Sequence, residues 1–467
     1  MLLPRRTLLK SAALGFPYLA FTSLAARAAQ AAAPPQTPDA RPQTLSPLSP
    51  KHPHFDARAK RIIFLCMNGG PSHVDMFDYK PRLTTDSGKS ITTPRGGSAT
   101  LLGSPWKFAR HGQSGHWISS LFPELARHAD DLCFVHSMQT DVPAHPQAFL
   151  QLHTGSFQFV RPSLGAWSLY GLGTTNENLP GFITLNPTQQ NGGAQNYGSS
   201  FLPAIYQGTR IGSEGRSLAD ARVQNIASQS LTPPGQRAQL DLIQSLNRAK
   251  LQRDQLNPQV EGVIESYELA FRMQAEVPRV MDLSGESAAT QKLYGLGDDT
   301  TDNFGRQCLL ARRFIESGVR FVEISHGNWD QHRNLETDHA RHAAAVDQPI
   351  AALLTDLKQR GLLKDTLVLW SGEFGRTPYA QGRDGRDHNH QGFTLWMAGG
   401  GVKPGLSYGA TDDIGATAVE NKVHIYDLHA TLLHLLGLDH EKLTFRHAGR
   451  DFRLTDVLGN VVKALVA

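Results

Sequence analysis

The chain has few cysteines. There are three in 467 residues, Cys66, Cys133 and Cys308, and they are far apart in the sequence. An odd number of widely spaced cysteines excludes both a disulfide framework and the paired spacing of a zinc knuckle. Cys66 and Cys133 lie inside apolar runs, where a free cysteine is typical of a hydrophobic core. We therefore expect these thiols to be buried.

Two further absences limit the partners. No run of basic residues is interleaved with aromatics, and a net charge of +4 is small for this length. Both features disfavour a nucleic acid as partner. Beyond the N-terminal segment, no stretch reaches the roughly 18 uninterrupted apolar residues of a spanning helix. We expect no membrane span in the mature chain.

The N-terminal segment has the three parts of a signal peptide. The arginine pair Arg5-Arg6 precedes an apolar, Ala-rich stretch that runs to about Leu24, and a small-x-small sequence ends at Ala28. Paired arginines resemble the twin-arginine variant. The apolar stretch is shorter than the roughly 20 residues of a spanning helix, so an uncut membrane anchor is the less favoured alternative. We predict that residues 1–29 are a twin-arginine signal peptide, with the twin-arginine export machinery as a partner and a periplasmic or extracellular location.

The rest of the chain predicts a short linker and one large α/β domain. Residues 30–57 are rich in Ala, Pro, Gln and Ser, as in a flexible linker. Residues 58–467 form the predicted domain, with an insertion at about 186–300 whose first part, 186–235, is polar. Buried strands alternate with helices, which favours a large, mostly parallel central sheet flanked by helices. The predicted strands are 61–67, 131–136, 181–185, 319–325, 366–370 and 393–398, and the predicted helices are 236–273, 302–318, 338–361 and 425–437.

Polar residues lie in the loops next to these strands, where the active site of an α/β protein is expected. In open α/β sheets, function lies at the carboxyl ends of the strands. Five such loops carry histidines or acidic residues, and they converge if the strands are parallel. The residues singled out are Asn68, His73, Asp75, His145, Asp330, His332, Glu373, Arg376 and His388.

Imidazole and carboxylate ligands together are typical of Zn²⁺, Mn²⁺ or Fe²⁺ sites. Asp330 and His332 share one loop, and His388 stands between two residues that could orient its ring. Arg376 is a candidate clamp for an oxyanion. We therefore predict a divalent-metal site that attracts an anionic ligand. By contrast, His339 and His342 fall on a predicted helix, which favours a surface or outer position. We interpret His429, His434, His440 and His447 as structural.

Five motifs, in order and spacing, resemble the bacterial "domain of unknown function 1501" family, which is sulfatase-like and belongs to the alkaline phosphatase superfamily. The resemblance spans about 58–440. It implies an alkaline-phosphatase-like or sulfatase-like fold with metals at strand carboxyl ends. The motifs are Asn68-Gly-Gly-Pro-Ser-His-Val-Asp-Met-Phe-Asp78, Trp329-Asp-Gln-His332, Gly372-Glu-Phe-Gly-Arg-Thr-Pro378, Gly385-Arg-Asp-His388 and Gly399-Gly-Gly-Val-Lys-Pro-Gly405.

The resemblance implies one complete metal position and one depleted position. Asp330, His332 and His388 match the family's Asp, His and late His. At the second position Asn68 stands where the superfamily has Asp, and Glu373-Phe374 replaces an Asp-His pair. Asn68 is neutral and Phe374 cannot bind a metal, so Asp75 or His73 is a possible substitute ligand. The metal is predicted as Zn, Mn, Ca or Fe.

The usual nucleophile is missing. Counting back from Thr154-Gly155, which resembles the superfamily's Thr-Gly, leads to His145 instead of Cys or Ser. Ser72, Ser137 and Thr140 are fallback nucleophiles.

Two functions remain open at this point. One is an exported metal-dependent hydrolase of sulfate, phosphate or related esters. Its catalytic residues would be His145 or His73 as acid or base and Arg376 for charge stabilisation, with covalent modification of His145 as a variant. The alternative is a non-catalytic protein that binds an anionic small molecule or glycan, or assembles with others.

Overall fold

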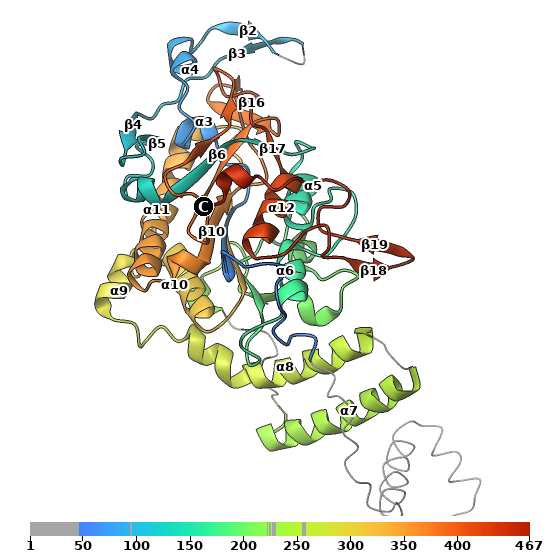
Figure 1. Cartoon of the computed structure of the whole chain (residues 1–467). Helices are drawn as coiled ribbons and strands as arrows, with labels where there is room; N and C mark the ends of the chain where they lie inside the picture. Colours follow the sequence, from blue (N-terminus) through green and yellow to red (C-terminus); the bar gives the residue numbers. More distant parts are fainter. Residues whose placement is uncertain (1–45, 94–95, 222, 224–225, 227–229, 255–257) are drawn as a thin grey trace, which may run out of the picture. The chain divides into compact units, whose positions relative to one another are not determined.

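The computed structural model describes residues 46–467, apart from 94–95, 222, 224–225, 227–229 and 255–257 (Figure 1). The predicted signal segment and the first part of the predicted linker lie outside the described residues. The end of that linker packs on the domain: Leu48 is buried, and its carbonyl accepts a hydrogen bond of 2.8 Å from the Thr174 N–H. No helix in the described part of the chain is both long and apolar enough to cross a membrane.

A nine-stranded sheet forms the centre of the fold. Its strands run in the order β14-β6-β13-β10-β1-β9-β7-β8, and β17 pairs with β6 off this path. Every pairing is parallel except those of β13, so the predicted large, mostly parallel sheet is confirmed. The strands are β1 (Arg61–Met67), β6 (Leu132–Gln139), β7 (Phe182–Leu185), β8 (Thr209–Ile211), β9 (Phe321–His326), β10 (Thr366–Ser371), β13 (Phe393–Ala398), β14 (Ser407–Tyr408) and β17 (Val423–His424).

β13 departs from the parallel arrangement. All six predicted strands are present, but β13 runs antiparallel to both β10 and β6. The chain therefore enters β13 at the edge where β1, β9 and β10 end. This direction explains how the residues before β13, His388 among them, reach the same edge as the residues after the parallel strands.

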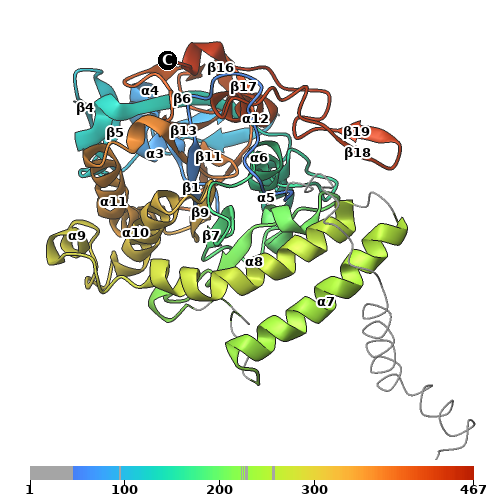
Figure 2. The same ribbon diagram turned by 60° about the horizontal axis from the view of Figure 1, so that its bottom comes forward.

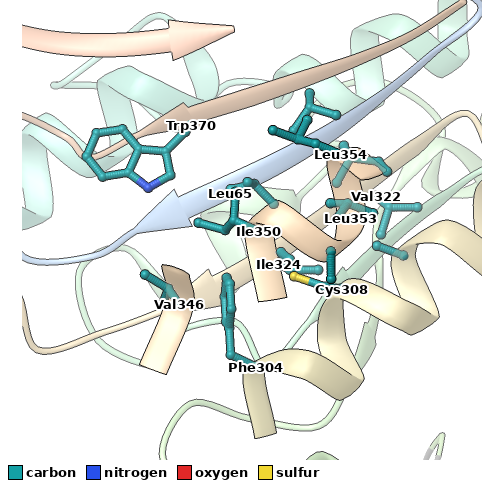
Figure 3. Close-up of a cluster of buried hydrophobic side chains, with 14 of the residues drawn as sticks. Leu65, Phe304, Cys308, Val322, Ile324, Val346, Ile350, Leu353, Leu354 and Trp370 are labelled. Atoms are coloured by element: carbon teal, nitrogen blue, oxygen red, sulfur yellow. The ribbon is translucent and has the colours of Figure 1, made fainter. Parts of the chain in front are cut away.

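Helices cover both faces of the sheet. Figure 2 shows α10 (Asp302–Glu316) and α11 (Leu335–Gln359) on one side of β1 and β9, and α5 (His145–Thr154), α6 (Leu164–Leu172) and α12 (Ile425–Leu435) on the other. The first face is closed by apolar contacts between strands and helices (Figure 3), with Leu65, Val322 and Trp370 facing Phe304, Cys308, Ile350 and Leu353. Cys66 and Cys133 are free and buried, as predicted, and so is Cys308, for which no prediction was made.

The segment 186–300 contributes to the sheet and adds two long helices. Strand β8, at one edge of the sheet, belongs to it. The helix predicted over 236–273 is divided into α7 (Pro233–Asp254) and α8 (Pro258–Met281).

Smaller elements complete the domain. The short helices are α3 (His73–Met76), α4 (Pro81–Thr85) and α9 (Ala288–Leu293). The two-stranded sheets pair β2 (Ser90–Thr92) with β3 (Ser98–Thr100), β4 (Phe108–His111) with β5 (His116–Ser119), β11 (Gly375–Gln381) with β12 (Gly385–Asn389), β15 (Ala410–Thr411) with β16 (Ala418–Glu420), and β18 (Phe445–His447) with β19 (Arg450–Phe452).

Candidate metal centre

Four predicted site residues meet at the carboxyl edge of the sheet. Asp330 and His332 follow β9, His388 lies on β12 just before β13, and His145 is the first residue of α5, which follows β6. One ligand atom from each of the four lies within 4.8 Å of the others. We call His145, Asp330, His332 and His388 the rim cluster.

Asp330 is the centre of the rim cluster. Its Oδ1 lies 2.8 Å from His332 Nε2 and 3.3 Å from His388 Nε2, and its Oδ2 lies 3.2 Å from His145 Nε2. The His332 and His388 Nε2 atoms are 2.9 Å apart. The Asp330 side chain is 42% exposed, so a ligand from solvent can reach the cluster.

The second nitrogen of each ring is held from outside the cluster. His145 Nδ1 lies 2.6 Å from a Glu373 carboxylate oxygen, and His388 Nδ1 lies 2.6 Å from the Pro143 carbonyl. His332 Nδ1 contacts the side-chain oxygen of Gln381. All three Nε2 atoms therefore point to the centre, in the arrangement that outer hydrogen bonds give to metal-binding histidines.

The donor set fits a divalent cation. Two neutral imidazoles cannot both present Nε2 lone pairs at 2.9 Å without a proton or a cation between them. His145 Nε2 is buried and has no hydrogen bond of good geometry, although Asp330 lies near it. The two imidazoles of His332 and His388 with the carboxylate of Asp330 suit Zn²⁺, Mn²⁺ or Fe²⁺.

The charges of His145 and Asp330 in the rim cluster stabilise each other. Burial lowers the pKa of His145, but the nearby carboxylates of Asp330 and Glu373 outweigh it and raise this pKa to about 9. Burial opposes ionisation of Asp330, yet His145, His388 and Arg376 hold the pKa of this carboxyl well below its usual range. Without a metal, the cluster is therefore an ionised carboxylate that stabilises a protonated His145.

Arg376 lies behind Asp330 and does not form an open clamp. Its side chain is fully buried, and Nη2 lies 2.5 Å from Asp330 Oδ1. The guanidinium also donates to the Gly69 and Gly70 carbonyls. These hydrogen bonds use the N–H groups of the guanidinium. In this structure Arg376 therefore positions Asp330 and has no free pair of N–H groups for an oxyanion.

Glu373 and Asn68 lie next to the rim cluster but do not belong to it. The buried Glu373 carboxylate contacts His145 and accepts hydrogen bonds of 3.1 Å from the Gly69 N–H. The Asn68 amide donates to Glu214 at 3.2 Å and accepts from Asn191 at 3.0 Å. Glu214 was missed, because it lies in the polar segment after β7 and no motif marks it.

The structure does not bring Asp75 and His73 to the rim cluster. Asp75 is fully buried, paired with Arg386 at 2.7 and 3.0 Å and hydrogen-bonded by the Ser72 hydroxyl at 2.5 Å. Its carboxylate thus has strong partners without a metal. His73 is also buried, with Nε2 2.8 Å from the Gly415 carbonyl.

The three fallback nucleophiles are buried and hydrogen-bonded elsewhere. The Ser72 hydroxyl donates to Asp75, and the Ser137 hydroxyl donates to the Asn421 carbonyl at 2.6 Å. The Thr140 hydroxyl donates to Gln151 at 2.7 Å. None of these hydroxyls is placed as an exposed attacking group at the rim cluster.

Of the two positions expected for His339 and His342, at the surface or outside the ligand set, the surface position is wrong. Both are buried where α11 packs on the sheet, and burial lowers their pKa values to about 3 and about 4. The His339 Nε2 accepts a hydrogen bond of 3.0 Å from the Ser72 N–H. Two of the C-terminal histidines are held inside the fold: His429 by the Leu152 carbonyl at 2.8 Å and His440 by Thr455 at 2.9 Å.

Several solved structures are similar to this chain at low identity. A lipoteichoic acid synthase from Listeria monocytogenes is 9% identical over 87% of this chain and 78% of its own, with a TM-score of 0.37. A sulfatase from Pseudoalteromonas sp. is 14% identical over 82% and 69%, with a TM-score of 0.36. A phosphonate monoester hydrolase from Silicibacter pomeroyi is 10% identical over 81% and 73%, also at 0.36.

A comparison with curated proteins gives no match. The family predicted from the motifs is confirmed: residues 59–466 match the model described as "Protein of unknown function (DUF1501)", and the chain belongs to this family.

Proposed function

We propose that the protein is an exported, metal-dependent hydrolase of sulfate, phosphate or related esters, and that the rim cluster is its active site. The observation that supports this most is the convergence of three imidazole Nε2 atoms on one partly exposed carboxylate, with each Nδ1 engaged elsewhere. A set of side chains fixed in this way is suited to a cation more than to a structural contact.

Asp330, His332 and His388 hold the metal in this proposal. A bound divalent cation supplies a Lewis acid for an ester oxygen and a bound water with a pKa near neutrality. Arg376 fixes Asp330 from behind, and the Gly69 and Gly70 carbonyls fix Arg376. The chain thus defines the position of the carboxylate before any substrate arrives.

His145 is the proposed proton donor. With Nδ1 on Glu373, its mobile proton is the one on Nε2, which faces the centre of the rim cluster. In the metal-free structure, the carboxylates of Asp330 and Glu373 raise the pKa of this ring to about 9. It is therefore placed to protonate a leaving oxygen, as a general acid requires.

The test is metal content and turnover in the same preparations. We expect His388→Ala to lose bound metal and to lose hydrolysis of every substrate that the wild type cleaves in a panel of aryl sulfates, phosphates and phosphonates. The matched control is His52→Ala, because His52 is an exposed histidine outside the cluster. Metal and turnover that survive in His388→Ala would remove this proposal.

The occupied hydroxyls favour a second candidate function. Ser72, Ser137 and Thr140 all donate to other groups in the fold. A protein of this fold could therefore bind an anionic small molecule or glycan ester without cleaving it. Metal-free protein that keeps its fold and binds such a ligand with unchanged affinity supports this alternative, whereas metal-dependent turnover eliminates it.

Export is part of the proposal and rests on the N-terminal sequence. The arginine pair Arg5-Arg6, the apolar stretch and the sequence ending at Ala28 support a twin-arginine signal. Changing both arginines to lysine should retain the protein in the cytoplasm, as measured by cell fractionation. Unchanged export of this variant would exclude the twin-arginine route.

A further inference from the structure

We propose that the chain binds a second cation, Zn²⁺, at a buried triad formed by Cys66, His153 and Glu323. Cys66 lies on β1, Glu323 on the neighbouring β9, and His153 on α5, which covers this face of the sheet. All three side chains are at least 97% buried. The buried triad is separate from the rim cluster, because His153 lies about two helical turns beyond His145 on α5.

The three ligand atoms are spaced as around one ion. Cys66 Sγ lies 4.0 Å from His153 Nε2, and His153 Nε2 lies 3.3 Å from a Glu323 carboxylate oxygen. One ligand atom from each residue lies within 4.8 Å of the others. Zinc bonds of about 2.3 Å to sulfur and about 2.0 Å to nitrogen or oxygen place ligand atoms at such separations.

The hydrogen bond of His153 directs a ring nitrogen toward the centre of the buried triad. Its Nδ1 lies 2.8 Å from the Phe149 carbonyl, so Nδ1 carries a proton. In the neutral ring, Nε2 then presents a lone pair to the Glu323 carboxylate. Two lone pairs repel each other unless a proton or a cation lies between them. Attachment of Nδ1 to a carbonyl is also how outer groups orient zinc-binding histidines.

Two oxygens near the buried triad are buried without a hydrogen-bond partner. Thr184 is the register partner of Glu323 on β7, so its side chain faces the same side of the sheet, and its Oγ1 has no partner. The Asn196 Oδ1 also has none, and Asn196 lines a small cavity of about 10 Å³ with His153 and Glu323. Such a space is about that of one water molecule or ion. These two oxygens, or a water in the cavity, are the candidates for a fourth ligand.

The charges balance when zinc is bound. Burial raises the pKa of the Cys66 thiol, so the thiol keeps its proton without a metal. Binding of Zn²⁺ forms the sulfur–zinc bond and releases that proton to water. One thiolate and one carboxylate then neutralise the two positive charges, which removes the cost of burying a net charge in the core.

The competing arrangement is a simple ion pair. Burial lowers the pKa of His153, but Glu323 outweighs it and raises this pKa, so a proton could take the place of the cation. The two arrangements differ in the role of Cys66, which becomes a metal ligand only when zinc is present.

Cobalt substitution isolates the role of Cys66. The full chain is refolded with Co²⁺, and the near-ultraviolet band of sulfur-to-cobalt charge transfer is recorded. The rim cluster contains no sulfur, so this band reports on the buried triad alone. We expect the band in wild type and in His388→Ala, and we expect Cys66→Ser to lose it. Cys133→Ser and Cys308→Ser, which change two other buried thiols, are the matched controls and should keep it.

Two results would overturn the second site. One is a refolded wild type without the band, and the other is a band that persists in Cys66→Ser. If Cys66→Ser does not fold, anomalous scattering at the zinc edge from wild-type crystals gives the answer. A peak beside Cys66 Sγ supports the site, and zinc-loaded crystals without that peak exclude it. Neither result depends on turnover, so failure of the proposed hydrolase leaves this test intact.

Discussion

Asp330 and Asp75 both follow strands of the central sheet, and both are predicted metal ligands, yet the fold gives them opposite surroundings. Asp330 is 42% exposed and contacts three imidazoles. Asp75 is fully buried and contacts Arg386 and the Ser72 hydroxyl. The difference shows that the partner of a carboxylate, more than its place after a strand, decides whether it can serve a metal.

The histidines near these two aspartates differ in the same way. In the rim cluster, the carboxylates of Asp330 and Glu373 raise the pKa of His145 to about 9 despite burial. Near Asp75, burial lowers the pKa of His339 to about 3 despite the nearby carboxylate. We therefore expect the first group to exchange protons and metals with solvent and the second to act in stability.

The largest effect should come from Asp330→Asn. This change keeps the shape of the side chain but removes the charge that three histidines share. We expect metal affinity to fall by more than the roughly 10- to 100-fold that loss of an outer partner costs. Metal titration followed by calorimetry measures it. Affinity within about 3-fold of wild type would contradict the central role given to Asp330.

Asp75→Asn should act on stability and leave metal binding unchanged. It leaves the Arg386 guanidinium buried without its counter-charge, and breaking such a buried pair typically costs about 3–5 kcal/mol in the free energy of unfolding. Urea unfolding measures the loss. The matched control is the double variant Asp75→Leu with Arg386→Met, which removes both charges and should lose less. If Asp75→Asn stays folded but contains less metal than the wild type, Asp75 contributes to metal binding and this prediction is wrong.

Glu373→Gln should have an intermediate effect on the rim cluster. The glutamine keeps the size of the side chain but weakens the contact with His145 Nδ1. We expect metal affinity or turnover to fall by about 10- to 100-fold, as for other outer partners. Glu420→Gln is the control, because Glu420 is exposed and belongs to neither cluster. Equal losses in the two variants would show that the effect is not local.

The sequence predicts the strands well because they depend on local pattern, and it names all four residues of the rim cluster, whose use as a metal site stays a prediction. Continuous apolar runs define β1, β10 and β13, and the polar residues after or before them define the edge. The direction of β13 could not be predicted, since an apolar run is the same for parallel and antiparallel strands. The hydrogen-bond partners of Asp75 and Asn68 could not be predicted from the sequence either. Arg386 is 311 residues from Asp75, and Glu214 lies in a segment without a motif.

The smallest effect is expected from His339→Gln. It concerns the pH dependence of the free energy of unfolding, to which a buried neutral histidine contributes. The folded pKa of His339 is about 3, against 6.5 for the ordinary group, so below about pH 6.5 the unfolded chain takes up a proton that the native chain does not. The neutral ring therefore contributes stability that is present above pH 6.5 and is lost as the pH falls toward 3. Between pH 6.5 and about pH 5 this loss is at most about 2 kcal/mol.

In His339→Gln the side-chain oxygen can still accept the hydrogen bond from the Ser72 N–H, but the group no longer titrates. Urea unfolding at about pH 7.5 and about pH 5 should therefore give a smaller difference in the free energy of unfolding than in wild type. His52→Gln, at an exposed position, should keep the wild-type difference. If both variants show the wild-type difference in unfolding free energy between the two pH values, His339 is not held neutral by burial. The surroundings of Asp75 and Asp330 would then differ, but the histidines near them would not.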